Sequence, residues 1–349
     1  MIASPVSVLV AGHFTPVSSP PRTLVALTPR ELDIFFPGAL RDHLAATLPG
    51  AKFIDPKSAP GEWAGVLSAF APEVMVTAWD CAPIPADLPS LRYICHVTGS
   101  VRHHIDRALI ERGVVVSNWG AVASETVAEA ALMMILCALR RAQYFGDLMH
   151  RQQGWSPLPA GTQSLFDRRV GIHGFGLVAK KLVVLLRPFR CQIRAFTKGV
   201  PESWFSEHSV DRAESLESLF DWADVLVEAE GLTPATRGLV TAPLLSRLRA
   251  GGTFVNIGRG ALVDEQALAH IAATGRIRIA SDVYETEPLH QNSPLRGLTE
   301  NVTLFPHVGG PTDDRFQLCG EFALRNLRTY LSGGTPEARV TLEVFDRAT

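Results

Sequence analysis

The sequence predicts an α/β fold with parallel sheets, and three observations support this. Short runs of β-forming residues alternate with amphipathic segments of helix length along most of the chain. The chain has 349 residues, which is enough for two domains with cores of their own. A glycine-rich stretch near the middle, GIHGFGLVA at 171–179, lies between a predicted strand and a predicted helix.

The first third of the chain carries four β-type runs, which we expect to form strands at Thr23–Leu27, Val74–Ala78, Arg92–His96 and Val114–Asn118. The first twenty residues look like an extension ahead of this core. A long helix is expected next, because Thr126 and Glu129 have the spacing of a capping box and the turns after them are apolar on nearly every face. Such a helix should be buried all round, between domains or subunits. We expect residues 154–163 to form a connection on the surface.

The alternation of strands and helices then restarts. Strands are predicted at Arg169–Gly174, Gln192–Phe196, Asp224–Ala229, Thr253–Gly258, Arg278–Val283 and Val302–Pro306. One intervening helix should have Asp264 as its N-cap and end at Gly275. A last helix is expected over 313–334.

Composition excludes several classes of partner. The formal net charge is −2, so neither nucleic acid nor an anionic membrane is expected as a partner. The apolar runs are too short for a signal peptide or a membrane span. Five scattered cysteines without C-x-x-C spacing suggest reduced thiols, and so a cytoplasmic protein.

The glycine-rich stretch has the context of a dinucleotide-binding turn. Gly174 would permit a tight turn, Gly176 would let backbone N–H groups approach a pyrophosphate, and Ala179 would keep the helix close to the strand. The N-terminus of the following helix, expected from Ala179 to about Arg187, would offer free N–H donors to the phosphates. The alternative is a plain turn between strand and helix.

The next strand should end in an acid that binds the adenine ribose, but Thr197 and Lys198 stand there and the nearest acid is Glu202. A hydroxyl and an ammonium can both bond a 2′-phosphate, which favours NADP(H) over NAD(H). The alternative is a lysine on a surface loop.

Three later stretches carry polar residues at strand ends. Because the carboxyl ends of parallel strands line one crevice, Arg259, Asp282, Glu287 and His307 could converge there. An arginine can bind a carboxylate with two prongs, and a histidine beside a carboxylate is a general acid near neutral pH. Reduction of a 2-keto acid requires a group that binds its carboxylate, a proton donor and a hydride carrier.

These stretches match a known family. The motifs LTPATRGLV (232–240), NIGRGALVDEQAL (256–268), DVYETEPL (282–289) and PHVGG (306–310) have the order and spacing of the D-isomer-specific 2-hydroxyacid dehydrogenases, which the chain resembles from about Arg22 to Leu331. The resemblance implies a catalytic trio of Arg259, Glu287 and His307. It also implies a cofactor site made of Gly174, Phe175, Gly176, Leu177, Val178, Thr197, Lys198, Ile257, Asp282 and Val127.

The resemblance implies an architecture as well. A Rossmann doubly wound parallel sheet, over 123–309, would be inserted into a flavodoxin-like discontinuous substrate domain made of 1–122 and 310–349. Helices near Ser124 and Pro311 would act as hinges, and the assembly would be a homodimer. The substrate would be a small 2-keto or 2-hydroxy acid, of the glyoxylate or hydroxypyruvate type.

The chain departs from the family in the substrate loop, Gly99–Asp106. Gly99, Ser100 and Val101 should still bind the substrate carboxylate through the backbone, although Val101 replaces a glycine. Arg102 and His103 could bind a second anionic group or form a solvated face. His103 and His104 lack further ligands at sensible spacing, so no metal is expected.

Two other departures leave alternatives open. Trp119 could border the mouth of the site or be a buried aromatic. The acids of VEAEG, at 227–231, stand where the family commonly has a histidine and a proline, and the resemblance places them close to where the cofactor ribose or pyrophosphate would pass. A different class of function, a dinucleotide-sensing corepressor or scaffold on the same fold, also retains the trio and remains an alternative.

Overall fold

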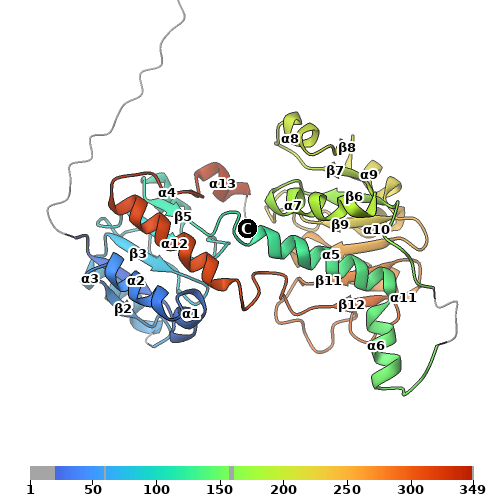
Figure 1. The fold of residues 1–349 in the computed structure, drawn as a ribbon, viewed down its shortest axis with the longest axis horizontal. Helices are drawn as coiled ribbons and strands as arrows, with labels where there is room; N and C mark the ends of the chain where they lie inside the picture. The colour runs from blue at the N-terminus through green and yellow to red at the C-terminus, as the bar shows by residue number, and fades with distance from the viewer. Residues whose placement is uncertain (1–19, 59, 157–160, 348–349) are drawn as a thin grey trace, which may run out of the picture.

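The computed structural model describes residues 20–58, 60–156 and 161–347, and it contains two parallel sheets in two lobes (Figure 1). The first sheet has the strand order β2-β1-β3-β4-β5. Its strands are β1 (Thr23–Ala26), β2 (Lys52–Ile54), β3 (Val74–Thr77), β4 (Tyr93–His96) and β5 (Val115–Ser117). Two parallel sheets confirm the predicted α/β class.

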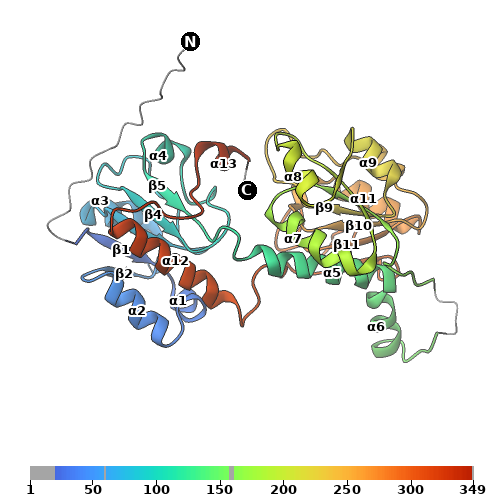
Figure 2. The same ribbon diagram turned by 45° about the horizontal axis from the view of Figure 1, so that its top comes forward.

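Helices cover both faces of this sheet. They are α1 (Pro29–Phe35), α2 (Ala39–Thr47), α3 (Trp63–Phe70), α4 (Arg107–Glu111), α12 (Phe316–Leu331) and α13 (Leu342–Arg347), with a 3₁₀ turn at Pro60–Glu62. One apolar core joins the sheet to α3, α4 and α13, and a second core on the other face joins it to α1, α2 and α12. The C-terminal helices α12 and α13 therefore pack with the lobe of β1–β5, as Figures 1 and 2 show.

The second sheet has the order β12-β11-β10-β9-β6-β7-β8. Its strands are β6 (Arg169–His173), β7 (Gln192–Phe196), β8 (Asp211–Arg212), β9 (Val225–Glu228), β10 (Thr253–Asn256), β11 (Arg278–Ser281) and β12 (Val302–Leu304). The chain runs outward from β6 in one direction and then, from β9, in the other. In such doubly wound sheets a ligand binds at the carboxyl ends of the strands where the order reverses, which here lies between β6 and β9.

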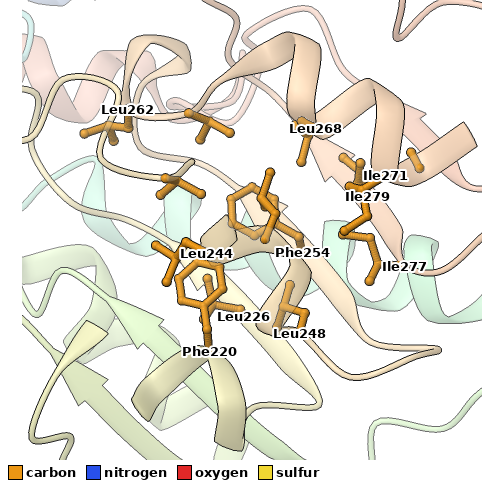
Figure 3. Close-up of a cluster of buried hydrophobic side chains, with 14 of the residues drawn as sticks. Phe220, Leu226, Leu244, Leu248, Phe254, Leu262, Leu268, Ile271, Ile277 and Ile279 are labelled. Carbon is orange, nitrogen blue, oxygen red and sulfur yellow. The ribbon is translucent and has the colours of Figure 1, made fainter. Parts of the chain in front are cut away.

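Two cores hold the helices on this sheet. The helices of this lobe are α5 (Ser124–Arg140), α6 (Ala142–His150), α7 (Leu177–Leu186), α8 (Glu202–Glu207), α9 (Leu216–Trp222), α10 (Ala242–Arg247) and α11 (Glu265–Ala273), with 3₁₀ turns at Arg187–Phe189 and Gly260–Leu262. On one face α5, α7 and α8 pack on the sheet. On the other face α9, α10 and α11 pack on it, and Figure 3 shows Phe220, Phe254 and Ile279 meeting there.

Several sequence predictions need correction. The long helix α5 begins at Ser124, and the Thr126 hydroxyl donates to the Ala123 carbonyl, so no capping box forms. Met133 of this helix is 41% exposed in the single chain, so burial of that face between subunits stays a prediction. In contrast, the Asp264 N-cap of α11 is confirmed by a hydrogen bond from the Ala267 N–H to its side chain.

The chain end also differs from the prediction. The last predicted helix is α12, but the short helix α13 follows it and was not foreseen. The predicted extension at 1–19 and part of the predicted connection, 157–160, lie outside the described residues. Within the described ranges, no helix is both long enough and apolar enough to cross a membrane.

Candidate active site

The glycine-rich turn has the shape that a dinucleotide needs. Gly174 has a φ of +88°, and a Cβ there would lie 2.5 Å from the backbone nitrogen of Glu230, so only glycine fits. Gly176 is the N-cap of α7 without a side-chain capping bond, and a Cβ on it would meet nothing within 4 Å. Open space therefore faces the uncapped N-terminus of a ten-residue helix, which suits a pyrophosphate. Only the backbone of Phe175 can contribute, because its side chain is buried against Phe205.

The substrate loop, the glycine turn and one member of the trio line a single cavity of about 370 Å³. The predicted site residues that line it are Gly99, Ser100, Val101, Val127, Gly176, Leu177, Val178, Ile257 and Arg259. Its volume is within the range of small-molecule sites. The remaining predicted residues, Phe175, Gly174, Thr197, Lys198, Asp282, Glu287 and His307, do not line this cavity.

His307 and Glu287 are brought into contact. The Nδ1 atom of His307 lies 2.6 Å from Oε2 of Glu287, whose Oε1 accepts a hydrogen bond from the Tyr284 N–H. The hydrogen bond to Glu287 raises the pKa of His307 above its ordinary value. Burial alone would raise the pKa of Glu287, but the hydrogen bonds from His307 and Tyr284 outweigh burial and lower it. The pair therefore favours an imidazolium held in one orientation.

Asp282 holds the turn that carries His307. Its carboxylate is buried and accepts hydrogen bonds from the N–H groups of Val308 at 2.8 Å and Gly309 at 2.7 Å. His307 itself has a φ of +55°, a strained conformation that persists only where its surroundings impose it. The contact with the nicotinamide that the family resemblance implies for Asp282 stays a prediction.

Arg259 is placed beside this pair by a glycine. A Cβ on the next residue, Gly260, would lie 1.8 Å from the Tyr284 carbonyl carbon, so the Arg259 turn packs directly on the turn that leads to Glu287. Burial lowers the pKa of Arg259, and the charge of Glu287 opposes this. The charge of Arg259 in turn lowers the pKa values of Glu287 and His307, although their hydrogen bond contributes more. The three charges therefore act on one another across a short distance.

Arg102 lines the candidate cavity and is partly exposed, so binding of a second anionic group there stays a prediction. Its guanidinium donates to the Phe345 carbonyl at 2.6 and 3.0 Å and to the Asp346 carbonyl at 2.8 Å. Arg107 binds the Asp346 carboxylate at 2.9 and 3.0 Å. Arg102 therefore ties the substrate loop to the end of α13, a contact between residues 243 positions apart that local sequence could not indicate.

Trp119 lines the cavity and is partly exposed. Its indole lies against the substrate loop so closely that a Cβ on Gly99 would come within 2.7 Å of it. His103 is exposed, and the described residues contain no group of three or more metal-binding side chains.

Sequence reasoning noted Glu228 among the acids of VEAEG but missed its buried contact with His173 beneath the glycine turn. His173 at the end of β6 and Glu228 at the end of β9 lie 2.6 Å apart, and they are 2% and 0% exposed. Each polar residue stands within an apolar strand, which is the signal that could have found the pair.

Comparisons with known proteins agree with this geometry. The family model "D-isomer specific 2-hydroxyacid dehydrogenase, NAD binding domain" matches residues 132–309. Glyoxylate/hydroxypyruvate reductase A HPR2 of Arabidopsis thaliana is 32% identical over 257 residues, which cover 72% of this chain and 79% of that protein. Hydroxyphenylpyruvate reductase of Plectranthus scutellarioides is 33% identical over 64% of this chain and 70% of that protein.

A solved structure shows the same fold. The glyoxylate reductase from Paecilomyes thermophila superposes with a TM-score of 0.78 at 22% sequence identity, over 92% of this chain and 99% of that one.

Proposed function

The chain belongs to the D-isomer-specific 2-hydroxyacid dehydrogenases, and on that premise we propose that it reduces a 2-keto acid to the D-2-hydroxy acid with a nicotinamide cofactor. The glyoxylate and hydroxypyruvate named for its relatives define the substrate type that we propose. The lobe with β6–β12, residues 123–309, would bind the cofactor. Residues 1–122 and 310–349 would form the substrate domain.

The proposed roles are those that the family resemblance implies, and the geometry supports them. Arg259 binds the substrate carboxylate and polarises the keto oxygen, helped by the backbone of Gly99, Ser100 and Val101 in the same cavity. When bound, the cofactor supplies the hydride. His307 donates a proton to the keto oxygen, and Glu287 stabilises the imidazolium. The other predicted cofactor residues, from Val127 to Asp282, would position the nicotinamide and the phosphates.

The contact between His307 and Glu287, within the charge field of Arg259, is the observation that carries this proposal. It supplies an orienting carboxylate in contact with a proton donor, and the charge of the proposed carboxylate anchor, Arg259, acts on both. A cofactor-sensing scaffold on this fold is expected to retain the same three residues, so turnover of a keto acid decides between the two functions.

The experiment is turnover of glyoxylate, hydroxypyruvate, pyruvate and hydroxyphenylpyruvate with NADH and with NADPH, followed by absorbance. H307N should lower kcat about 10²- to 10⁴-fold, because general acid catalysis is worth that much. H150N, at an exposed histidine of α6, is the matched control and should keep wild-type kcat. Cofactor binding without turnover of any keto acid would instead favour the corepressor or scaffold function.

Two finer features belong to the same proposal. We expect a homodimer, since Met133 on α5 and Met149 on α6 are exposed apolar side chains in one part of the cofactor lobe. A cytoplasmic location stays a prediction from the cysteine pattern. NADP(H) as the preferred cofactor was predicted from Thr197 and Lys198, and the relatives do not test this preference.

A further inference from the structure

A chain of hydrogen bonds crosses the carboxyl ends of three strands at the glycine turn. It begins with the buried pair of His173 and Glu228. Burial alone would lower the pKa of His173, but the charge of Glu228 outweighs burial and raises it. Two buried, oppositely charged groups in contact form a rigid support, because separating either of them from its partner is costly.

A hydrogen bond connects Glu228 of this support to Glu230. The Oε1 atom of Glu228 accepts a hydrogen bond from the Glu230 N–H at 3.0 Å. The Glu230 carboxylate accepts two further bonds, from the Thr197 hydroxyl at 2.8 Å and from the Gly231 N–H at 2.9 Å. Its backbone and its carboxylate are therefore both fixed, and the carboxylate lies at the end of β7.

The position of Glu230 is that of a cofactor-binding group. It is partly exposed and lines the same cavity as Gly176 and Arg259. Its backbone nitrogen would lie 2.5 Å from a Cβ on Gly174, so it adjoins the turn expected to bind the pyrophosphate. In dinucleotide-binding folds, a carboxylate at the end of the strand after this turn accepts hydrogen bonds from the adenine ribose.

We propose that Glu230 recognises the ribose 2′-hydroxyl of the cofactor, and that the protein binds NADH more tightly than NADPH. The inference rests on the proposed function, since it concerns the same cofactor site. Glu230, which follows β9, would replace the acid that is missing after β7. It also reverses the preference for NADP(H) that was predicted from the local sequence.

Two cations near β7 favour the opposite preference. Lys198 is exposed, and Arg347 donates to the Gly199 carbonyl at 3.3 Å while paired with Glu343 at 2.9 Å. The attraction of the exposed Lys198 for a 2′-phosphate is weaker than the repulsion from the hydrogen-bonded Glu230 carboxylate. Solvent screens the lysine, and ordering its long side chain costs entropy. The Thr197 hydroxyl already donates to Glu230, so it does not offer its proton to a phosphate. A 2′-phosphate beside Glu230 would bring like charges together.

The test is direct titration of the intact protein with NADH and with NADPH, followed by fluorescence and without a keto acid. The wild type should bind NADH at least about tenfold more tightly, because a like-charge contact between protein and ligand is strongly unfavourable. E230Q keeps the shape of the side chain and removes its charge, so the ratio of the two Kd values should shift about tenfold toward NADPH.

The matched control is E202Q. Glu202 is the nearest acid along the chain after Thr197, but it is exposed and paired with Arg212 at 2.9 Å. E202Q changes the net charge as E230Q does, and it should leave the ratio unchanged. Tighter binding of NADPH by the wild type, or an E230Q ratio equal to that of the wild type, would overturn the inference and leave the reductase proposal standing. Failure to bind either cofactor would overturn both.

Discussion

Replacement of Gly260 by alanine would test whether close packing of two turns sets the catalytic geometry. A Cβ at Gly260 would lie 1.8 Å from the Tyr284 carbonyl carbon, 2.1 Å from the Tyr284 oxygen and 2.3 Å from the Glu285 nitrogen. Ordinary carbon contacts begin near 3.5 Å, so the two turns must separate by roughly 1.7 Å, which is 3.5 − 1.8. Because the Tyr284 N–H binds Glu287, this separation moves Glu287, and His307 with it, away from Arg259.

The expected loss is large and local. A misplacement of about 1 Å costs roughly 100-fold in rate, so kcat/KM for the best keto acid should fall at least that far in G260A. Overpacking should also lower the free energy of unfolding by about 1–3 kcal/mol. Cofactor affinity should stay within about threefold of the wild type, because the glycine turn that is expected to bind the phosphates lies on another strand.

The matched control has an equal overlap at a residue that does not line the cavity. A Cβ on Gly320 in α12 would lie 1.8 Å from the Phe35 carbonyl oxygen at the end of α1. G320A should therefore lose stability to a similar extent and keep wild-type kcat in its folded fraction. Steady-state kinetics corrected by thermal unfolding followed by circular dichroism separates the two effects. Wild-type kcat in G260A, or equal kcat losses in both variants, would refute the reasoning.

Two further predictions concern single side chains. In E287Q, the strongest cause of the raised pKa of His307 is removed, so His307 loses its proton at lower pH. Since keto-acid reduction needs the imidazolium, the alkaline limb of its kcat/KM profile should move to lower pH; E285Q, at an exposed neighbour, should leave the limb in place, and an unmoved limb in E287Q would contradict the role of His307. R102M removes the hydrogen bonds that tie the substrate loop to the end of α13, and bonds from a charged donor are worth about 1.5–3 kcal/mol each. Amide exchange in α13 should quicken at least tenfold by mass spectrometry, and unchanged exchange would show that Arg102 does not anchor that helix.

The sequence predicted the sheets well because their central strands are buried runs. Gln192–Phe196 matches β7 residue for residue, and the other predicted strands contain the observed ones. The missed strands β2 and β8 lack this signal, because β2 has three residues that are exposed or half-buried and β8 has two exposed residues. The missed helix α13 has six residues, most of which are not buried. The contact of His307 with Glu287 followed from the rule that parallel strand ends share one edge. That rule predicts which residues lie close together, but it does not predict their hydrogen bonds. The hydrogen bonds by which Asp282 holds the His307 turn were therefore not predicted.

The adenosine end of the site shows why local sequence can mislead about chemistry. The usual rule examines the residues directly after β7, where Thr197 and Lys198 suggest a phosphate. The structure brings Glu230 to the same place from 33 residues away, across the end of β6, which lies between β7 and β9 in the sheet. The crossing is possible because Gly174 has no side chain: the backbone of Glu230 lies where a Cβ would collide with it. The glycine that identifies the turn therefore also allows an acid from another strand to take over the recognition of the ribose, and an absent acid after β7 does not by itself indicate NADP(H).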